Sequence, residues 1–168
     1  MTATETATQA SARIRREIKT TLGLNSRDVG VRTELYSMGS SIYVTIKTMR
    51  AFEHRARISE LVHDAARVSY DGYTGEILSG GNRFSHFGYS EACRDAVAAR
   101  NIEAMEAARA ELGEDPQPGE WVRVPGTTSL ALGFSADYHQ LEVFDLEGHE
   151  RRLVNSTTEA AFVAETLN

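Results

Sequence analysis

The feature that most constrains the fold is a pair of short segments, residues 29–36 and 42–47, in which apolar and polar residues alternate. Alternate side chains of a β-strand point to opposite faces, so each segment has one apolar face and one polar face. The five residues between them, 37–41, are rich in Gly and Ser and suit the turn of a β-hairpin. A lone hairpin is only marginally stable in water, so the apolar face of this one must be covered by other elements.

Stretches with helical periodicity lie on both sides of the hairpin. Ile14 and Ile18 belong to an apolar series at intervals of four residues, which predicts a helix over residues 8–22 that stops at Gly23. Downstream, apolar residues at intervals of three and four predict a second helix over residues 51–68. We therefore expect an N-terminal unit of helix, hairpin and helix.

Residues 69–90 differ from their neighbours because turn-forming and aromatic residues dominate this segment. Its Asp-Gly and Gly-Gly pairs predict turns, and residues 84–89 have the pattern of a strand. A third, long helix should follow from Ser90, a good N-cap, to Leu112. The alanines and paired charges of this helix also suit a dimerisation surface, which makes a homodimer an alternative to a monomer.

A Pro/Gly-rich linker, residues 113–119, is the strongest boundary signal in the chain. Four short alternating segments between residues 120 and 154 then predict an antiparallel β-meander. Ser156 and Glu159 have the spacing of a capping box, which predicts the start of a closing helix. The predicted fold is α+β, with an α+β domain over residues 1–112, the linker 113–119, and a small meander-plus-helix domain over residues 120–168.

Charge is unevenly distributed along the 168 residues, whose net charge is −6. Residues 1–50 contain eight Lys/Arg against four Asp/Glu, whereas residues 113–168 contain three against ten. An acidic C-terminal part disfavours nucleic-acid binding by the whole chain, while the N-terminal part has enough cations for a local basic surface. The alternative interpretation is that these charged side chains only form a solvated surface and bind no partner. The candidate nucleic-acid-binding residues are Arg13, Arg16, Lys19, Arg32, Lys47 and Arg50.

The sequence contains no recognisable membrane or export segment. No run approaches the roughly 18 apolar residues that a membrane span requires, and residues 1–9 lack the apolar core of a signal peptide. We therefore expect no membrane partner and a soluble protein with a cytoplasmic location.

Catalytic and metal-binding patterns are also missing. The single cysteine, Cys93, falls inside a predicted helix, where a small core residue is expected more than a nucleophile. His54 and His63 lie nine residues apart on one predicted helix, too far to bind the same metal ion. A hydrolase built around His86 and Asp71 is a third option. We expect a protein that is not an enzyme, with no catalytic residues, no metal site and no cofactor.

Aromatic side chains gather in the turn-rich segment. Aromatic residues with a polar tip dominate recognition surfaces, which makes this segment the candidate partner-binding surface. The alternative is that these rings close the bottom of the hydrophobic core. The candidate partner-binding residues are Tyr70, Asp71, Tyr73, Phe84, His86, Phe87 and Tyr89.

Four short motifs of the N-terminal part occur in a recognisable order. They are Ile14-Arg15-Arg16-Glu17-Ile18-Lys19, residues 31–36, Met38-Gly39-Ser40-Ser41-Ile42-Tyr43-Val44 and Tyr70-Asp71-Gly72. With these motifs, residues from 12 to about 100 resemble a domain found within the large polyvalent proteins of phages and conjugative elements. The chain departs from that family at Lys47-Thr48-Met49, where the family has an aromatic residue and an acid after its second strand.

A fainter resemblance concerns the C-terminal part and rests on Ser129, Gly133-Phe134, Leu141, Val143-Phe144 and Gly148. With these residues, the segment 124–167 is similar to the small domain that trails some bacterial lysyl-tRNA synthetases.

The first resemblance implies a non-catalytic domain of a mobile element, often delivered into a host cell, where companion proteins oppose host defences. We therefore expect an interaction protein of a phage, prophage or plasmid whose partner is a host protein. Its acidic C-terminal half would be able to imitate nucleic acid toward a basic target. The competing expectation is a nucleic-acid-binding accessory protein that uses the basic N-terminal face.

Overall fold

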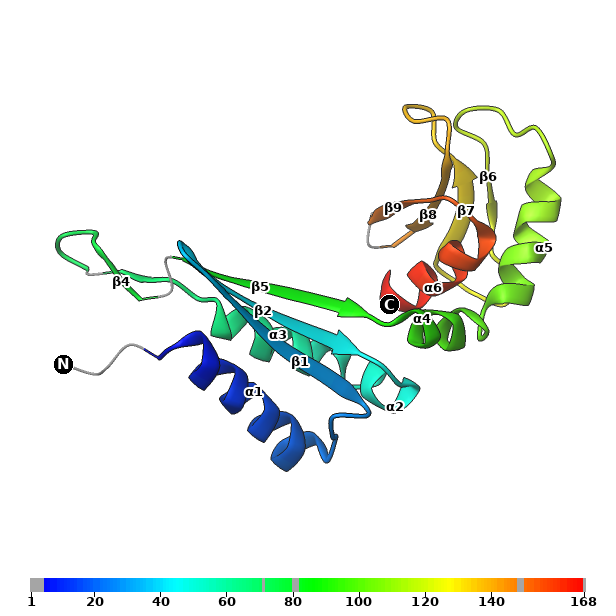
Figure 1. The fold of residues 1–168 in the computed structure, drawn as a ribbon. Helices are drawn as coiled ribbons and strands as arrows, with labels where there is room; N and C mark the ends of the chain where they lie inside the picture. Colours follow the sequence, from blue (N-terminus) through cyan, green and yellow to red (C-terminus); the bar gives the residue numbers. More distant parts are fainter. Residues whose placement is uncertain (1–4, 71, 80–81, 148–149, 168) are drawn as a thin grey trace. The chain divides into compact units, whose positions relative to one another are not determined.

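Helices and strands are mixed along the chain in the computed structural model, which confirms the predicted α+β class (Figure 1). The structure describes residues 5–70, 72–79, 82–147 and 150–167. The chain divides into two compact units, residues 1–93 and residues 94–168. The sequence placed the boundary later, at residues 113–119. Helix α5 (Ile102–Leu112) accounts for the difference, because its apolar side belongs to the core of the second unit.

The first unit is built on a three-stranded sheet. Its strands are β1 (Val29–Tyr36), β2 (Gly39–Ile46) and β5 (Arg83–Tyr89), in the order β1-β2-β5. Strand β2 is central, since it pairs antiparallel with β1 and parallel with β5. The other elements up to the unit boundary are α1 (Ala7–Leu22), α2 (Met49–Phe52), α3 (Arg55–Ala65), β3 (Ser69–Tyr70) and β4 (Ile77–Ser79), and α4 (Glu91–Ala98) runs across that boundary.

The predicted hairpin is present, but its turn is shorter than expected. Strand pairing starts with Tyr36 opposite Gly39, which leaves only residues 37 and 38 between the strands. The predicted five-residue tip is therefore wrong. Residues 39–41 belong to β2 because they pair with β1, and Ser40 and Ser41 pair with β5 as well.

Strand β5 joins the sheet by a pairing between residues that are far apart in the sequence. At the start of this pairing, the amide of Ser40 donates to the carbonyl oxygen of Asn82 (2.9 Å). The same oxygen lies where a Cβ atom of residue 39 would stand, so β2 approaches it this closely only because Gly39 has no side chain. A strand at residues 84–89 was predicted, but its parallel partner was not.

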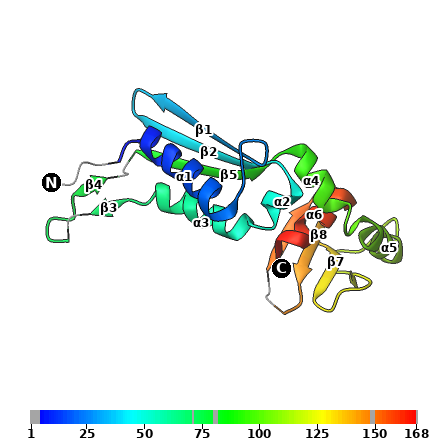
Figure 2. The same ribbon diagram turned by 90° about the horizontal axis from the view of Figure 1, so that it is seen from below.

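Helices α1 and α3 cover the same face of this sheet (Figures 1 and 2). Their apolar sides pack against the apolar side of β2, which supplies the cover that the hairpin requires. The opposite face of the sheet is left uncovered by these helices. The buried residues of this core include Ile14, Ile18, Ile42, Val44, Ile46, Ile58, Leu61 and Val62.

The second predicted helix is in fact two, α2 and α3. Helix α2 begins at the N-cap Thr48, whose Oγ1 accepts a hydrogen bond from the amide of Ala51 (3.3 Å), and it ends after Phe52. Phe52 and Ile58 are both fully buried. On one straight helix, residues six apart point in directions that differ by roughly 120°. The break lets both side chains face the core.

The single helix predicted over residues 90–112 is likewise divided, into α4 and α5. The chain turns at residues 99–101, where the amide of Asn101 donates to the carbonyl oxygen of Ala98 (3.0 Å). Asparagine is a weak helix former, because its side chain competes for hydrogen bonds. Here the Asn101 side-chain amide donates to Glu165 Oε1 (2.8 Å) in α6 (Thr157–Leu167).

Arg83 ties the start of α1 and the end of α3 to strand β5. Its Nη1 donates to the carbonyl oxygen of Ala65 (2.9 Å), and its Nη2 donates to the carbonyl oxygen of Glu5. The carboxylate of Glu5 in turn accepts a hydrogen bond from Arg13 Nε (3.0 Å). This hydrogen bond lowers the pKa of Glu5, against the opposing effect of burial. One guanidinium thus links three elements that are distant in the sequence.

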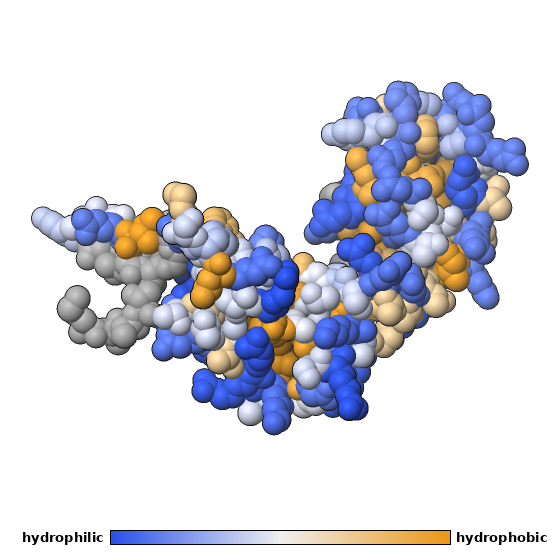
Figure 3. Space-filling model, in the orientation of Figure 1, coloured by the Kyte–Doolittle hydropathy of each residue, from blue (hydrophilic) through white to orange (hydrophobic). Residues whose placement is uncertain are grey.

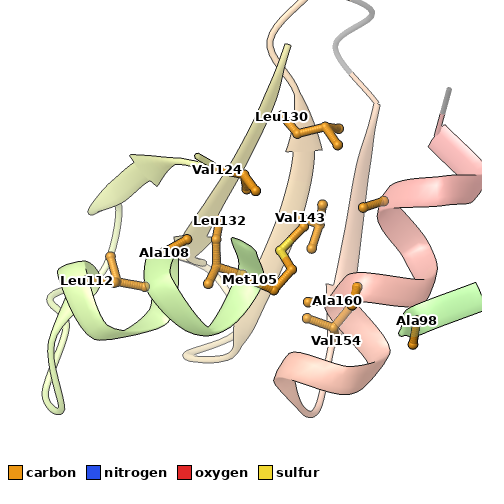
Figure 4. Close-up of a cluster of buried hydrophobic side chains, with 12 residues drawn as sticks. Ala98, Met105, Ala108, Leu112, Val124, Leu130, Leu132, Val143, Val154 and Ala160 are labelled. Atoms are coloured by element: carbon orange, nitrogen blue, oxygen red, sulfur yellow. The ribbon is translucent and has the colours of Figure 1, made fainter. Parts of the chain in front are cut away.

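The second unit contains the predicted antiparallel meander and closing helix. Helices α5 and α6 pack against the sheet and against each other. Figure 4 shows Met105 of α5 beside Leu132 and Val143, within a cluster of buried apolar side chains. The four strands, each paired with the next, are β6 (Trp121–Arg123), β7 (Leu130–Phe134), β8 (Leu141–Asp145) and β9 (Arg151–Val154).

The capping signal before α6 is used in part. The amide of Glu159 donates to Ser156 Oγ (3.1 Å), as a capping box requires. The Glu159 carboxylate, however, accepts from the amide of Asn155 (2.7 Å), one residue earlier than in a regular box.

We predict that Gly39→Ala destabilises the first unit by about 1–3 kcal/mol, because the new methyl group would push against the main-chain oxygen of Asn82. The control is Gly88→Ala in the same sheet, where a Cβ atom meets nothing within 4 Å. Native-state hydrogen exchange of the β2 amides measures the difference, since the only tryptophan, Trp121, lies in the second unit. Equal protection in the two variants would contradict the proposed role of Gly39.

We also predict that Glu5→Gln lowers the stability of the first unit at neutral pH. A carboxyl group with a lowered pKa stabilises the fold above its ordinary value of 4.5, and the contribution disappears as the pH falls through its folded-state pKa. The gap between Glu5→Gln and the natural protein should therefore close in acid. Thermal unfolding followed by circular dichroism across this range tests the prediction. The control is Glu17→Gln, which loses only a longer contact with Arg13 (3.8 Å).

Candidate functional site

The predicted aromatic set is divided between the two faces of the sheet. Alternate residues of β5 point in opposite directions, so Phe84 and His86 lie on the open face. Phe87 and Tyr89 lie on the helix side, where their rings contact each other edge to face (centroids 5.4 Å apart). The ring of Tyr89 also contacts that of the buried Phe52 (5.7 Å). The rings of Phe87 and Tyr89 thus contact the core, as the alternative reading expected, whereas partner binding by Phe84 and His86 stays a prediction.

The other members of that set lie near the β3–β4 connection. Tyr73 is fully exposed in the turn between these two strands. Tyr70 belongs to β3, and Asp71 falls outside the residues that the structure describes. The proposed pairing of His86 with Asp71 in a hydrolase is therefore not addressed by the structure.

A row of stacked side chains crosses the open face. Arg32, Tyr43 and His86 are direct neighbours on β1, β2 and β5. The rings of Tyr43 and His86 are parallel (10°), with centroids 4.5 Å apart. The Arg32 guanidinium lies 4.6 Å from the centre of the Tyr43 ring and forms an ion pair with Glu34 (2.7 Å). Sequence reasoning missed Tyr43, because only the register of all three strands brings the row together.

Large apolar side chains are exposed at the hairpin end of the sheet. We name this group the tip patch, and it consists of Leu35 (71% exposed), Tyr36 (47%), Met38 (79%) and Phe84 (54%). The hydroxyl of Tyr36 lies 3.4 Å from that of Ser41, which pairs with Phe84, so Tyr36 and Phe84 are close on the open face. Leu35 precedes Tyr36 on β1 and points to the helix side, so the tip patch extends around this end of the sheet onto both of its faces. Exposed apolar groups of this kind are typical of protein interaction sites.

The six predicted nucleic-acid-binding residues do not form one surface. Arg13 is paired with Glu5 (3.0 Å) and Arg32 with Glu34 (2.7 Å), so two of the six cations are already neutralised. Arg16 is exposed on α1, and Arg50 donates to the carbonyl oxygen of Gly23 (3.1 Å). Lys19 and Lys47 both line the cavity described next.

This cavity lies between the second half of α1 and the start of β1. Its volume is about 440 Å³. In Figure 3, a strip of hydrophobic surface bordered by hydrophilic residues is visible between these two elements. The cavity is lined by the aliphatic residues Ile18, Leu24, Val29 and Val31, by the cations Arg15, Lys19 and Lys47, and by Asn25, Ser26 and Gly30.

Two of the features weighed for chemistry, the cysteine and a metal site, fall within the part of the chain that the structure describes. Cys93 is buried, as predicted, and burial raises the pKa of its thiol, so it is unsuited to act as a nucleophile. Within the described ranges, no group of three His, Cys, Asp or Glu side chains is placed to hold a metal ion.

None of the helices described is both long enough and apolar enough to span a membrane. Comparison of the chain with family models, with curated proteins and with solved structures finds no match.

Proposed function

We propose that this chain is a non-enzymatic interaction protein that binds a host protein through the tip patch of its first unit. The observation that carries the proposal is the exposure of Leu35, Tyr36, Met38 and Phe84 at one end of the sheet. Leaving large apolar side chains in water is unfavourable, and binding a partner there would remove that apolar area from solvent.

Two properties of the tip patch favour a protein as its partner. The patch combines aliphatic and thioether side chains with two aromatic rings, a composition that suits the apolar centre of a protein interface. It also lies on a hydrogen-bonded sheet whose hairpin turn has only two residues, so little conformational entropy is lost on binding.

The mobile-element origin in this proposal rests on the resemblance of residues 12–100 to the domain of phage and conjugative polyvalent proteins. A chain of that kind, delivered into a bacterial cell, would act by occupying the surface of a host protein, for example one that belongs to a defence system. The second unit has six Lys/Arg against 14 Asp/Glu, and this acidic character is compatible with imitation of nucleic acid.

To test the tip patch, we would place a photo-crosslinking amino acid at Met38 or Phe84 and irradiate the protein in an extract of the bacterial host. We expect one host protein to be captured from both positions. Adding Leu35→Lys should reduce capture about tenfold or more, since it places a charge in an apolar interface. The control position is Tyr138, which is 67% exposed in the second unit. Capture of the same proteins from Tyr138, or none from the patch, would refute the proposal.

The alternative, a nucleic-acid-binding accessory role, predicts a different outcome in a titration with single-stranded and duplex DNA. Its affinity should fall steeply with salt, with a logarithmic slope of about −0.9 for each duplex phosphate that is neutralised. Lys19→Glu should then weaken binding, whereas Arg13→Gln, which removes a cation already paired with Glu5, should change it little. We expect no saturable DNA binding. A steep salt slope with this mutational pattern would establish the alternative instead.

A further inference from the structure

We infer that the cavity between α1 and β1 binds an extended acidic peptide, in which an aliphatic side chain is flanked by carboxylates and the main chain pairs with the free edge of β1. We name this site the α1–β1 groove. It is separate from the tip patch and does not depend on the partner proposed there.

The first support is an unpaired strand edge. In the described residues, β1 pairs only with β2. The amide of Lys47 donates to the carbonyl oxygen of Asp28 (2.8 Å), so residues 28, 30, 32 and 34 direct their main-chain groups toward β2. The alternate residues Val31, Thr33 and Leu35 therefore direct theirs outward. Arg15 Nη2 donates to the Val31 carbonyl oxygen (2.6 Å), so a peptide strand that pairs there would displace this hydrogen bond and leave the Arg15 guanidinium to the peptide's carboxylates.

The second support is the charge of the groove. Arg15, Lys19 and Lys47 line it, and no carboxylate is among the lining residues. The side chain of Lys47 lies across Gly30, and its Nζ donates to the carbonyl oxygen of Ser26 (3.1 Å), so this cation is held at the groove. Unlike Arg13 and Arg32, these three cations form no ion pair with any described residue. They are therefore available to carboxylates of a ligand.

The third support is the apolar floor, which favours a peptide over a nucleic acid. Single-stranded nucleic acids are bound by stacking of bases on aromatic rings beside a basic track. The floor of this groove is entirely aliphatic, with Ile18, Leu24, Val29 and Val31, and the lining contains no aromatic ring. An aliphatic floor suits a Leu, Ile or Val side chain. Addition of a strand to a sheet edge, with pockets for alternate side chains, is an established mode of peptide recognition.

The experiment is a selection of ten-residue peptides from a displayed random library against the full chain. We expect enrichment of sequences in which Asp or Glu flanks an aliphatic residue. Lys19→Glu and Lys47→Glu should each weaken the selected peptide about tenfold or more, measured by fluorescence anisotropy. The control is Arg67→Glu, because Arg67 is in the same unit and its side chain is 81% exposed but does not line the groove. Binding by the control should change by no more than about twofold, as expected for a solvent-screened charge outside the groove.

Use of the strand edge has its own readout. On peptide binding, the amides of Val31 and Thr33 should become protected from hydrogen exchange. Two sets of alternate peptide residues can be N-methylated. Methylation of the set whose amides face β1 should abolish binding, whereas methylation of the other set should preserve it.

Four outcomes would overturn the inference. The first is the absence of enrichment, and the second is enrichment without acidic residues. The third is equal competition by an oligothymidylate with the same dependence on Lys19 and Lys47, which would make the groove a general anion site. The fourth is protection of the β1 amides that depends on protein concentration without any peptide, which would mean that a second copy of the chain occupies the edge.

Discussion

The structure of the first unit depends on the burial and two-sided pairing of strand β2. Its residues Ile42, Val44 and Ile46 are buried under α1 and α3, and its main chain pairs with β1 on one edge and β5 on the other. A slip of one residue would turn this apolar side toward water, so burial fixes the register. Its register with β1 and β5 then determines which residues of those strands lie on the open face and which main-chain groups of β1 point outward.

Local patterns in the sequence were sufficient to predict the hairpin, α1, the meander and α6. They could not predict the parallel pairing of β2 with β5, because the hydrogen bond from Ser40 to Asn82 joins residues that share no local pattern. The divided helices show a related limit. Phe52 and Ile58 each fit a buried helical position, but only the sheet beneath them shows that both must face it, which requires a break in the helix. The predicted domain boundary was based on the Pro/Gly composition of residues 113–119, whereas the contacts of Met105 place α5 in the second unit.

The candidate sites were limited in the same way. The aromatic residues were selected because they are dense between residues 70 and 89. This selection combined side chains of β5 that point to opposite faces of the sheet. Counting cations in residues 1–50 gave no indication of which were paired, and pairing distinguishes Arg13 and Arg32 from Arg15, Lys19 and Lys47. Lys47 lies across Gly30 and borders the groove, a position that no count of cations along the sequence could indicate.

The stacked row on the open face explains why we expect binding at the tip patch and at the α1–β1 groove and not at the centre of the open face. Tyr43 has Arg32 on one neighbouring strand and His86 on the other, so both faces of its ring are already in contact. Cation–π and ring-stacking contacts contribute about 0.5–1.5 kcal/mol each, and a ligand that stacked on Tyr43 would have to displace one of them. The guanidinium of Arg32 is further held by Glu34. The row therefore stabilises the middle of the sheet, while the side chains of the tip patch and the outward main-chain groups of β1 have fewer contacts to lose when a partner binds.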